Sequence, residues 1–202
     1  MQDLVILVAD KNAQFALRGA LARHAAMGMR PLSFEFRTHP GRDGGVRTSG
    51  PALLAGESTR FRHALLVMDH EGCGQHDVPA LTIEETLDVE LRRQWDGRGK
   101  AIVIDPEVDI WIWGNDNALG TVLDWPLDQP IRDWLQERGF AFGEDGKPIR
   151  PKEALDAMRP IHKQPRSSAL YEKVTSQISL RRCTDRAFMR LRAQLLAWFP
   201  ES

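Results

Sequence analysis

The chain has 202 residues, of which 42% are hydrophobic and 27% charged, and its net charge is −1. These fractions are those of an ordinary globular protein, so they exclude a disordered, collagen-like or coiled-coil chain, and the length suits one domain with an appendage. No run approaches the ~18 apolar residues of a membrane span, and the N-terminal segment carries an acid where a signal peptide carries basic residues. We therefore expect no membrane partner. Because there are only two cysteines, we expect a cytoplasmic protein with reduced thiols.

Charge is distributed unevenly along the chain. Residues 147–202 contain 12 basic and 5 acidic residues, a balance of +7, whereas residues 1–146 contain 15 basic and 23 acidic residues, a balance of −8. A basic C-terminal segment beside an acidic body favours a contact to a phosphate backbone next to a metal-binding acidic cluster. The alternative is that the basic residues form an ordinary solvated helix face.

Short apolar segments alternate with helical segments through the first 125 residues. The segments expected to be strands are residues 4–9, 33–38, 63–68 and 100–105. The second of these alternates apolar and polar residues, so we place it near an edge, whereas the others have apolar cores and suit strands buried on both faces. The alternation predicts an α/β domain over residues 1–125, a mostly parallel sheet flanked by helices.

Helical spacing of apolar residues predicts the connections between these strands. The helices are expected at residues 13–27, 51–55 and 82–95. Thr82 is the expected N-cap of the last one, with Glu85 completing a capping box. The glycines and proline of residues 39–45 predict an irregular loop, and residues 107–114 suit either a short strand or the start of a helix.

Strand signals stop after Leu123. Four helices are expected beyond that point, at residues 130–140, 151–159, 167–179 and 184–199. We therefore expect residues 126–202 to form a helical C-terminal appendage that packs on the same core.

Acidic residues follow the predicted strands at the points where the strands end. They are Asp10, Asp69, Glu71, Asp105 and Asp109. Ligands of an open α/β sheet bind outside the carboxyl ends of its strands. Carboxylates that meet there at ~4 Å repel by roughly 1 to 4 kcal/mol, so they require a cation, and Mg²⁺ prefers such oxygen ligands. The alternative is that the acids are only N-caps and turn formers.

Several motifs extend this pattern. A strand that ends in an acid is followed by an alanine-rich helix and by a strand that ends in D-x-[DE], an order that resembles the Toprim fold of topoisomerases, primases and overcoming-lysogenization-defect nucleases. The stretches IDPEVDIWIWGND and SLRRCTDRAFMRLRAQL are similar to a compact Toprim-like family of bacterial proteins. VADKNAQFALRGAL, HPGRDGG and MDHEGCG resemble the small Toprim-like component of bacterial methylation-associated anti-phage defence systems.

The resemblance implies a Mg²⁺-dependent nuclease, or a nucleic-acid-binding subunit, of an anti-phage defence system with other defence proteins as partners. It makes Asp10, Asp69 and Glu71 catalytic, and it makes Asp69, Glu71 and Asp109 ligands of Mg²⁺ or Mn²⁺. The family pattern has Glu in place of Asp10, Asp in place of Glu71 and Glu in place of Asp109. Each difference moves a carboxylate by ~1.5 Å, more than a rigid octahedral site tolerates. The alternative is a non-catalytic scaffold that docks a partner protein.

Basic residues near these motifs are the candidate contacts to nucleic acid. Lys11 follows the first acid, and Arg42 lies among glycines whose backbone N–H groups can approach an anion closely. Arg182, Arg186 and Arg190 form a stripe with i, i+4, i+8 spacing, opposite the apolar residues Phe188, Leu191 and Leu195. The alternative for all five is an ordinary solvated position.

His70, Cys73 and His76 form an H-x₂-C-x₂-H pattern. Three ligands of this kind suit zinc, but a structural zinc site shows a second tight pair, which the sequence lacks. The alternatives are a turn with a buried thiol or, for His70, proton transfer beside the acids.

Overall fold

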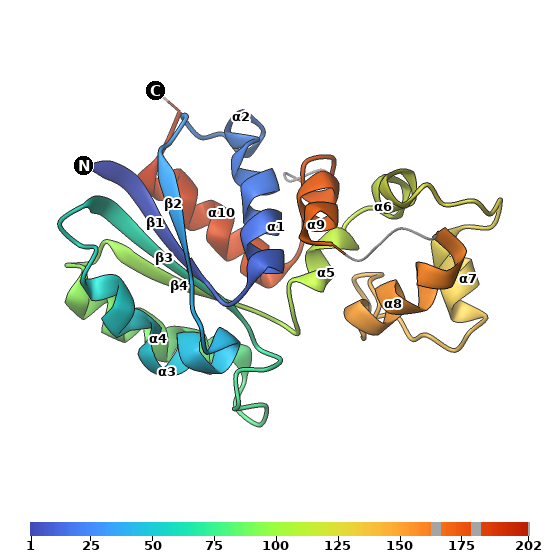
Figure 1. Ribbon diagram of the computed structural model, residues 1–202, viewed down its shortest axis with the longest axis horizontal. Helices are drawn as coiled ribbons and strands as arrows, with labels where there is room; N and C mark the ends of the chain where they lie inside the picture. The colour runs from blue at the N-terminus through green and yellow to red at the C-terminus, as the bar shows by residue number, and fades with distance from the viewer. Residues whose placement is uncertain (163–166, 179–182, 202) are drawn as a thin grey trace.

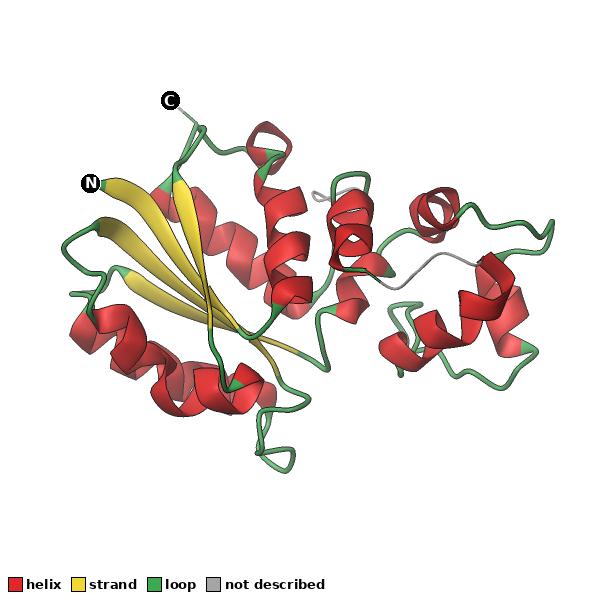
Figure 2. Ribbon diagram, in the orientation of Figure 1, coloured by secondary structure: helices red, strands yellow, loops and turns green. Residues whose placement is uncertain are grey.

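The computed structural model describes residues 1–162, 167–178 and 183–201. In this part of the chain, four parallel strands form one sheet in the order β2-β1-β3-β4 (Figure 2). The strands are β1 (Gln2–Val8), β2 (Phe34–Thr38), β3 (Phe61–Asp69) and β4 (Gly99–Ile104). The predicted α/β class, with a parallel sheet flanked by helices, is confirmed, and β2 lies at an edge as expected.

Alternate residues of the central strands enter two separate cores. Leu4 and Ile6 of β1 face one core, and Val5 and Leu7 face the other; all four are fully buried. This follows from the period of two in a strand and from helices on both faces of a parallel sheet. Such a sheet places the carboxyl ends of its strands along one edge, free of the covering helices.

Helices cover both faces of the sheet (Figure 1). α1 (Lys11–Leu21) and α10 (Arg186–Trp198) share a core on one face, and α3 (Arg42–Ala55) and α4 (Ala80–Gln94) share a core on the other. α2 (His24–Met27) follows α1, and α9 (Ser168–Thr175) packs on α1. A Cβ atom at Gly19 would overlap Thr175 and the Glu172 backbone, so this glycine permits the close approach of α1 and α9.

The remaining helices lie mostly beyond α9, away from the sheet (Figure 1). They are α5 (Asp109–Ile112), α6 (Asp116–Leu123), α7 (Ile131–Gln136) and α8 (Pro151–His162). The residues after 126 therefore occupy two places: α7 and α8 belong to this outlying group, whereas α9 and α10 lie on the sheet domain. Apolar residues from both places join the same buried cluster as β1.

The structure corrects two local predictions. α3 begins inside the segment 39–45, which was expected to be irregular, because the His39 ring accepts a hydrogen bond from Gly41 N at 3.0 Å and packs where a side chain at Gly45 would stand. α4 begins at Ala80 after Pro79, with no side-chain cap, so the predicted cap at Thr82 is wrong. Proline supplies a helical φ at that position without needing a hydroxyl cap.

Candidate functional site

A cavity of about 420 Å³ lies at the carboxyl ends of the strands. Its lining includes six carboxylates, those of Asp10, Asp43, Asp69, Glu71, Glu107 and Asp109. The structure thus brings together all four acids to which the resemblance gives a role. We call this space the acidic cavity.

The sheet topology explains why the acids converge. From β1 the chain passes to β2 on one side and then returns across β1 to β3, so the order reverses between β1 and β3, where α/β sheets bind ligands. Asp10 follows β1 and caps α1 by accepting a hydrogen bond from Ala13 N at 2.9 Å. Asp69 is the last residue of β3, and Asp43 lies in the first turn of α3, after β2.

Asp69 is at the centre of the charge cluster. Its Oδ1 atom accepts a hydrogen bond from Val108 N at 2.9 Å, and its own N–H donates to Asp43 Oδ1 at 2.8 Å. Removal from water, followed by the charges of Asp43 and Asp10, raises the pKa of Asp69 well above its ordinary value. Burial likewise raises the pKa of Asp43, although the Asp69 N–H opposes the shift. The cavity therefore favours either protonation of its carboxyl groups or a bound cation.

Glu107 is a buried carboxyl group that lines the same cavity. Burial, with Asp109 nearby, raises its pKa to about 7, and Lys152 opposes this shift from 3.6 Å. Its Oε1 atom is buried and has no hydrogen-bond partner among the residues that the structure describes. A buried acceptor without a donor costs about 1–3 kcal/mol. A ligand with positive charge would remove this cost.

Asp109 is buried, and α9 holds it in place. Its Oδ1 atom accepts a hydrogen bond from the Tyr171 hydroxyl at 2.8 Å. The C-terminal part of the chain therefore contributes to the acidic cavity, both through Tyr171 and through Lys152.

The donor atoms of the acidic cavity are hard oxygens, which suit Mg²⁺ or Mn²⁺. The uncompensated charge and the orphaned Glu107 oxygen also fit a divalent cation. Among the described residues, however, no three His, Cys, Asp or Glu side chains stand in an arrangement that could hold one metal ion together. The acids share a cavity without forming a complete ligand set.

Three charged residues of the cavity were missed from the sequence: Asp43, Glu107 and Lys152. Asp43 follows β2 much as Asp10 follows β1, but the expectation of an irregular loop concealed this. Glu107 stands two residues before Asp109, within the quoted tryptophan-rich stretch. Lys152 belongs to α8, far along the chain from the acids, so no sequence spacing indicates that it lies beside them.

The three residues of the H-x₂-C-x₂-H pattern have different surroundings. His70 Nε2 lies 2.7 Å from the Val78 carbonyl oxygen, and its Nδ1 lies 3.5 Å from Asp105. Cys73 is buried in the core shared with α3 and α4, and His76 lines the acidic cavity. The three side chains therefore do not form the zinc site considered from the sequence.

The candidate nucleic-acid contacts have different surroundings. Arg42 lines the acidic cavity and is exposed, with a left-handed φ of 50°. Strained backbone of this kind costs about 1–3 kcal/mol and is concentrated at functional sites. Lys11 is exposed at the start of α1 but does not line the cavity, and Arg182 lies outside the described residues.

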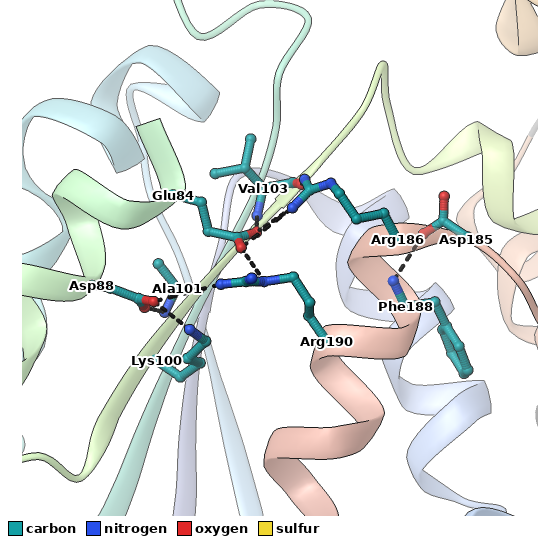
Figure 3. Close-up of polar contacts among 9 residues, drawn as sticks. All are labelled: Glu84, Asp88, Lys100, Ala101, Val103, Asp185, Arg186, Phe188 and Arg190. Atoms are coloured by element: carbon teal, nitrogen blue, oxygen red, sulfur yellow. Dashed lines mark hydrogen bonds and ion pairs between the residues drawn. The ribbon is translucent and has the colours of Figure 1, made fainter. Parts of the chain in front are cut away.

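Arg186 and Arg190 have a structural task instead of forming a free basic stripe (Figure 3). Arg186 donates to the Val103 carbonyl oxygen at 2.6 Å and pairs with Glu84 at 3.3 Å. Arg190 also pairs with Glu84, whose carboxylate accepts a hydrogen bond from Val103 N at 2.8 Å. The prediction of an exposed arginine stripe needs this correction: the two guanidinium groups compensate a fully buried glutamate.

The same network continues along β4. Asp88 accepts a hydrogen bond from Ala101 N at 2.7 Å and pairs with the buried Lys100 (Figure 3). Carboxylates from α4 thus satisfy backbone N–H groups of β4, which has no neighbouring strand on that side among the described residues. A covered edge protects a sheet from pairing with another chain. We call these side chains, Glu84, Asp88, Lys100, Arg186 and Arg190, the edge network.

Comparisons of the chain with protein-family models, with curated proteins and with solved structures gave no match. Within the described ranges, no helix has both the length and the apolar character needed to cross a bilayer. The resemblance to Toprim proteins therefore rests on the short motifs quoted above, and the geometry of the acidic cavity carries the functional argument.

Proposed function

We propose that the chain is a Mg²⁺- or Mn²⁺-dependent phosphodiesterase, a Toprim-like nuclease of a bacterial anti-phage defence system. The observation that carries the chemistry is the convergence of six carboxylates on one cavity at the switch point of a parallel sheet. The defence role rests on the sequence resemblance alone, as do nucleic acid and other defence proteins as partners and the cytoplasmic location.

Electrostatics supports a metal at this site. Carboxyl groups with raised pKa values stand close together, and a divalent cation would favour their ionised form. Asp69 and Glu71 would hold the ion, with Asp109 near it. When bound, the cation would stabilise the charge that develops on a phosphodiester as it is cleaved.

The chain's own residues have separate roles in this proposal. Asp10, fixed at the cavity by its hydrogen bond from Ala13 N, would accept or donate the proton at the reacting oxygen. Arg42 would orient the phosphate, because it lines the acidic cavity and remains exposed.

Calorimetric titration of MnCl₂ tests the metal claim. Wild type is expected to bind Mn²⁺, and the double variant Asp69→Asn, Glu71→Gln should bind at least about tenfold more weakly with its fold retained. The matched control is Asp105→Asn, an acid that also follows a strand but lies outside the cavity lining; it should bind as wild type does. Identical curves for wild type and the double variant would remove the metal claim.

A non-catalytic subunit that binds nucleic acid or docks a partner is the second candidate. It is favoured by the lack of a preformed ligand set in the described residues and by the three one-methylene differences from the family pattern. Incubation of end-labelled DNA with the protein and Mn²⁺ separates the two candidates. Cleavage of the DNA by wild type but not by the double variant supports the nuclease. DNA that remains uncut although the protein binds Mn²⁺ supports the second candidate.

A further inference from the structure

A second polar cavity, of about 450 Å³, lies among the outlying helices. It is formed by the start of α6, by α7, by residues 145–147 and by residues 183–184, and it shares no lining residue with the acidic cavity. Its size falls within the range of small-molecule sites, roughly 300–1,000 Å³. We call it the Lys147 cavity.

Lys147 is the feature of this cavity that its own fold does not explain. The residue is only 5% exposed, and Nζ has no hydrogen-bond partner in residues 1–162, 167–178 and 183–201. The nearest carboxylate oxygen, Asp145 Oδ2, is 3.6 Å away. Lys100 is comparably buried, but it is paired closely with Asp88. A buried ammonium group without hydrogen bonds is unfavourable, so the burial of Lys147 does not by itself stabilise the fold.

The loop around Lys147 fixes its position. Gly143 N donates to the Lys147 carbonyl oxygen at 2.8 Å, and Lys147 N donates to Asp145 Oδ1 at 3.1 Å. The lysine backbone is thus anchored at both its donor and its acceptor, and the residue is part of the cavity lining.

Arg132 of α7 supplies a second cation to the same space. It donates to the Gly146 carbonyl oxygen at 2.5 Å, lies over the Phe142 ring and stands 3.7 Å from Asp116. These contacts orient the guanidinium group, whose fork of donors matches phosphate oxygens.

Acidic and amide side chains also line this cavity. Asn115 caps α6 through hydrogen bonds from Asn117 N and Ala118 N, so these helix N–H groups are already satisfied. An anion in this cavity would therefore depend on Lys147 and Arg132. Asp116 and Asp145 would repel a compact polyanion but would accept hydrogen bonds from hydroxyl or amino groups of a ligand.

We propose that the Lys147 cavity binds a small phosphomonoester that also carries hydrogen-bond donors, with a nucleoside monophosphate as the size and chemistry that fit. Its phosphate lies between Lys147 and Arg132, and its hydroxyl groups face the two aspartates. The site is independent of the acidic cavity, so a failure of the proposed nuclease activity would not affect binding here.

Calorimetric titration with adenosine 5′-monophosphate, inorganic phosphate and adenosine tests this assignment. Wild type should bind the monophosphate most tightly, phosphate more weakly and adenosine least. Lys147→Met should weaken binding of the monophosphate by at least about tenfold. Lys173→Met removes the same charge from an exposed position of α9 and should bind as wild type does.

Thermal unfolding separates a ligand-binding lysine from a structural one. Lys147→Met should melt no lower than wild type, because it removes a buried charge without hydrogen bonds. Arg132→Lys keeps the positive charge but loses the paired N–H donors of the guanidinium group. It should weaken binding of the monophosphate more than binding of adenosine. The proposal is wrong if wild type binds neither the monophosphate nor phosphate at millimolar concentration, if both variants bind as wild type does, or if Lys147→Met lowers the melting temperature.

Discussion

At the scale of single residues, the acidic cavity brings together carboxylates that repel one another and that have too few hydrogen-bond donors. Asp69, Asp43 and Glu107 all have pKa values raised mainly by burial. Glu107 adds an oxygen without a hydrogen-bond partner among the described residues. An ordinary structural site would neutralise such groups with fixed cations, as the edge network does for Glu84. The contrast is typical of a site that waits for a ligand.

The raised pKa of Glu107 predicts a pH dependence of stability. Its value of about 7 in the folded chain exceeds its ordinary 4.5, so the folded chain holds this proton more tightly than the unfolded chain. Its contribution to stability is complete below pH 4.5 and is lost as the pH rises through 7. Glu107→Gln, which resembles the protonated form, should be more stable than wild type at pH 8 by about 1–3 kcal/mol.

Urea unfolding at pH 5 and pH 8 checks this difference. The control is Glu153→Gln, because Glu153 is a nearby acid whose pKa is lowered, mainly by a backbone hydrogen bond. That variant should show no gain at pH 8. Equal stability of Glu107→Gln and wild type at both pH values would contradict the assignment of the raised pKa.

At the scale of elements, the fold depends on how helices meet strands and one another. The edge network joins α4, β4 and α10 through one buried glutamate and its two arginines (Figure 3). α1 and α9 meet at a contact that a glycine makes possible. Both contacts join parts of the chain that lie far apart in sequence, and they tie the C-terminal helices to the sheet domain.

Removal of Glu84 should strongly destabilise the protein. Glu84→Ala would leave Val103 N without its acceptor and remove the carboxylate that pairs with both arginines, and breaking a buried pair costs about 3–5 kcal/mol. It would also open the β4 edge, so self-association should increase. Denaturant titration and size-exclusion chromatography measure the two effects. The exposed neighbour Glu85→Ala should change neither, and a stable monomeric Glu84→Ala would show that the edge network is dispensable.

Gly19→Ala tests the α1–α9 contact. The added methyl group would overlap Thr175 and the Glu172 backbone, and crowding of this kind costs about 1–3 kcal/mol. Gly56→Ala is the control, because its nearest neighbour atom is 3.9 Å from the added carbon. Thermal melting should separate the variants, and equal melting temperatures would mean that the helices do not pack as closely as described.

At the scale of the whole molecule, sequence patterns predicted the sheet better than its surroundings. The apolar runs and the acids that follow them were sufficient for a parallel sheet and for a common edge where Asp10, Asp69 and Glu71 lie, because period and chain order determine both. The start of α3 was missed because the glycines of residues 39–45 predicted a loop, whereas the His39 ring accepts a hydrogen bond from Gly41 N directly before the helix. The pairing of Arg186 with Glu84, and the approach of Lys152 to Glu107, depend on packing between distant segments, which spacing does not encode.

The most direct test of the central claim is a crystal grown with Mn²⁺ and examined by anomalous diffraction. The proposed function predicts a Mn²⁺ peak in the acidic cavity, bound by oxygen atoms of Asp69 and Glu71. Well-ordered carboxylates at these two positions with no Mn²⁺ between them, at a concentration that saturates a metal site, would contradict it.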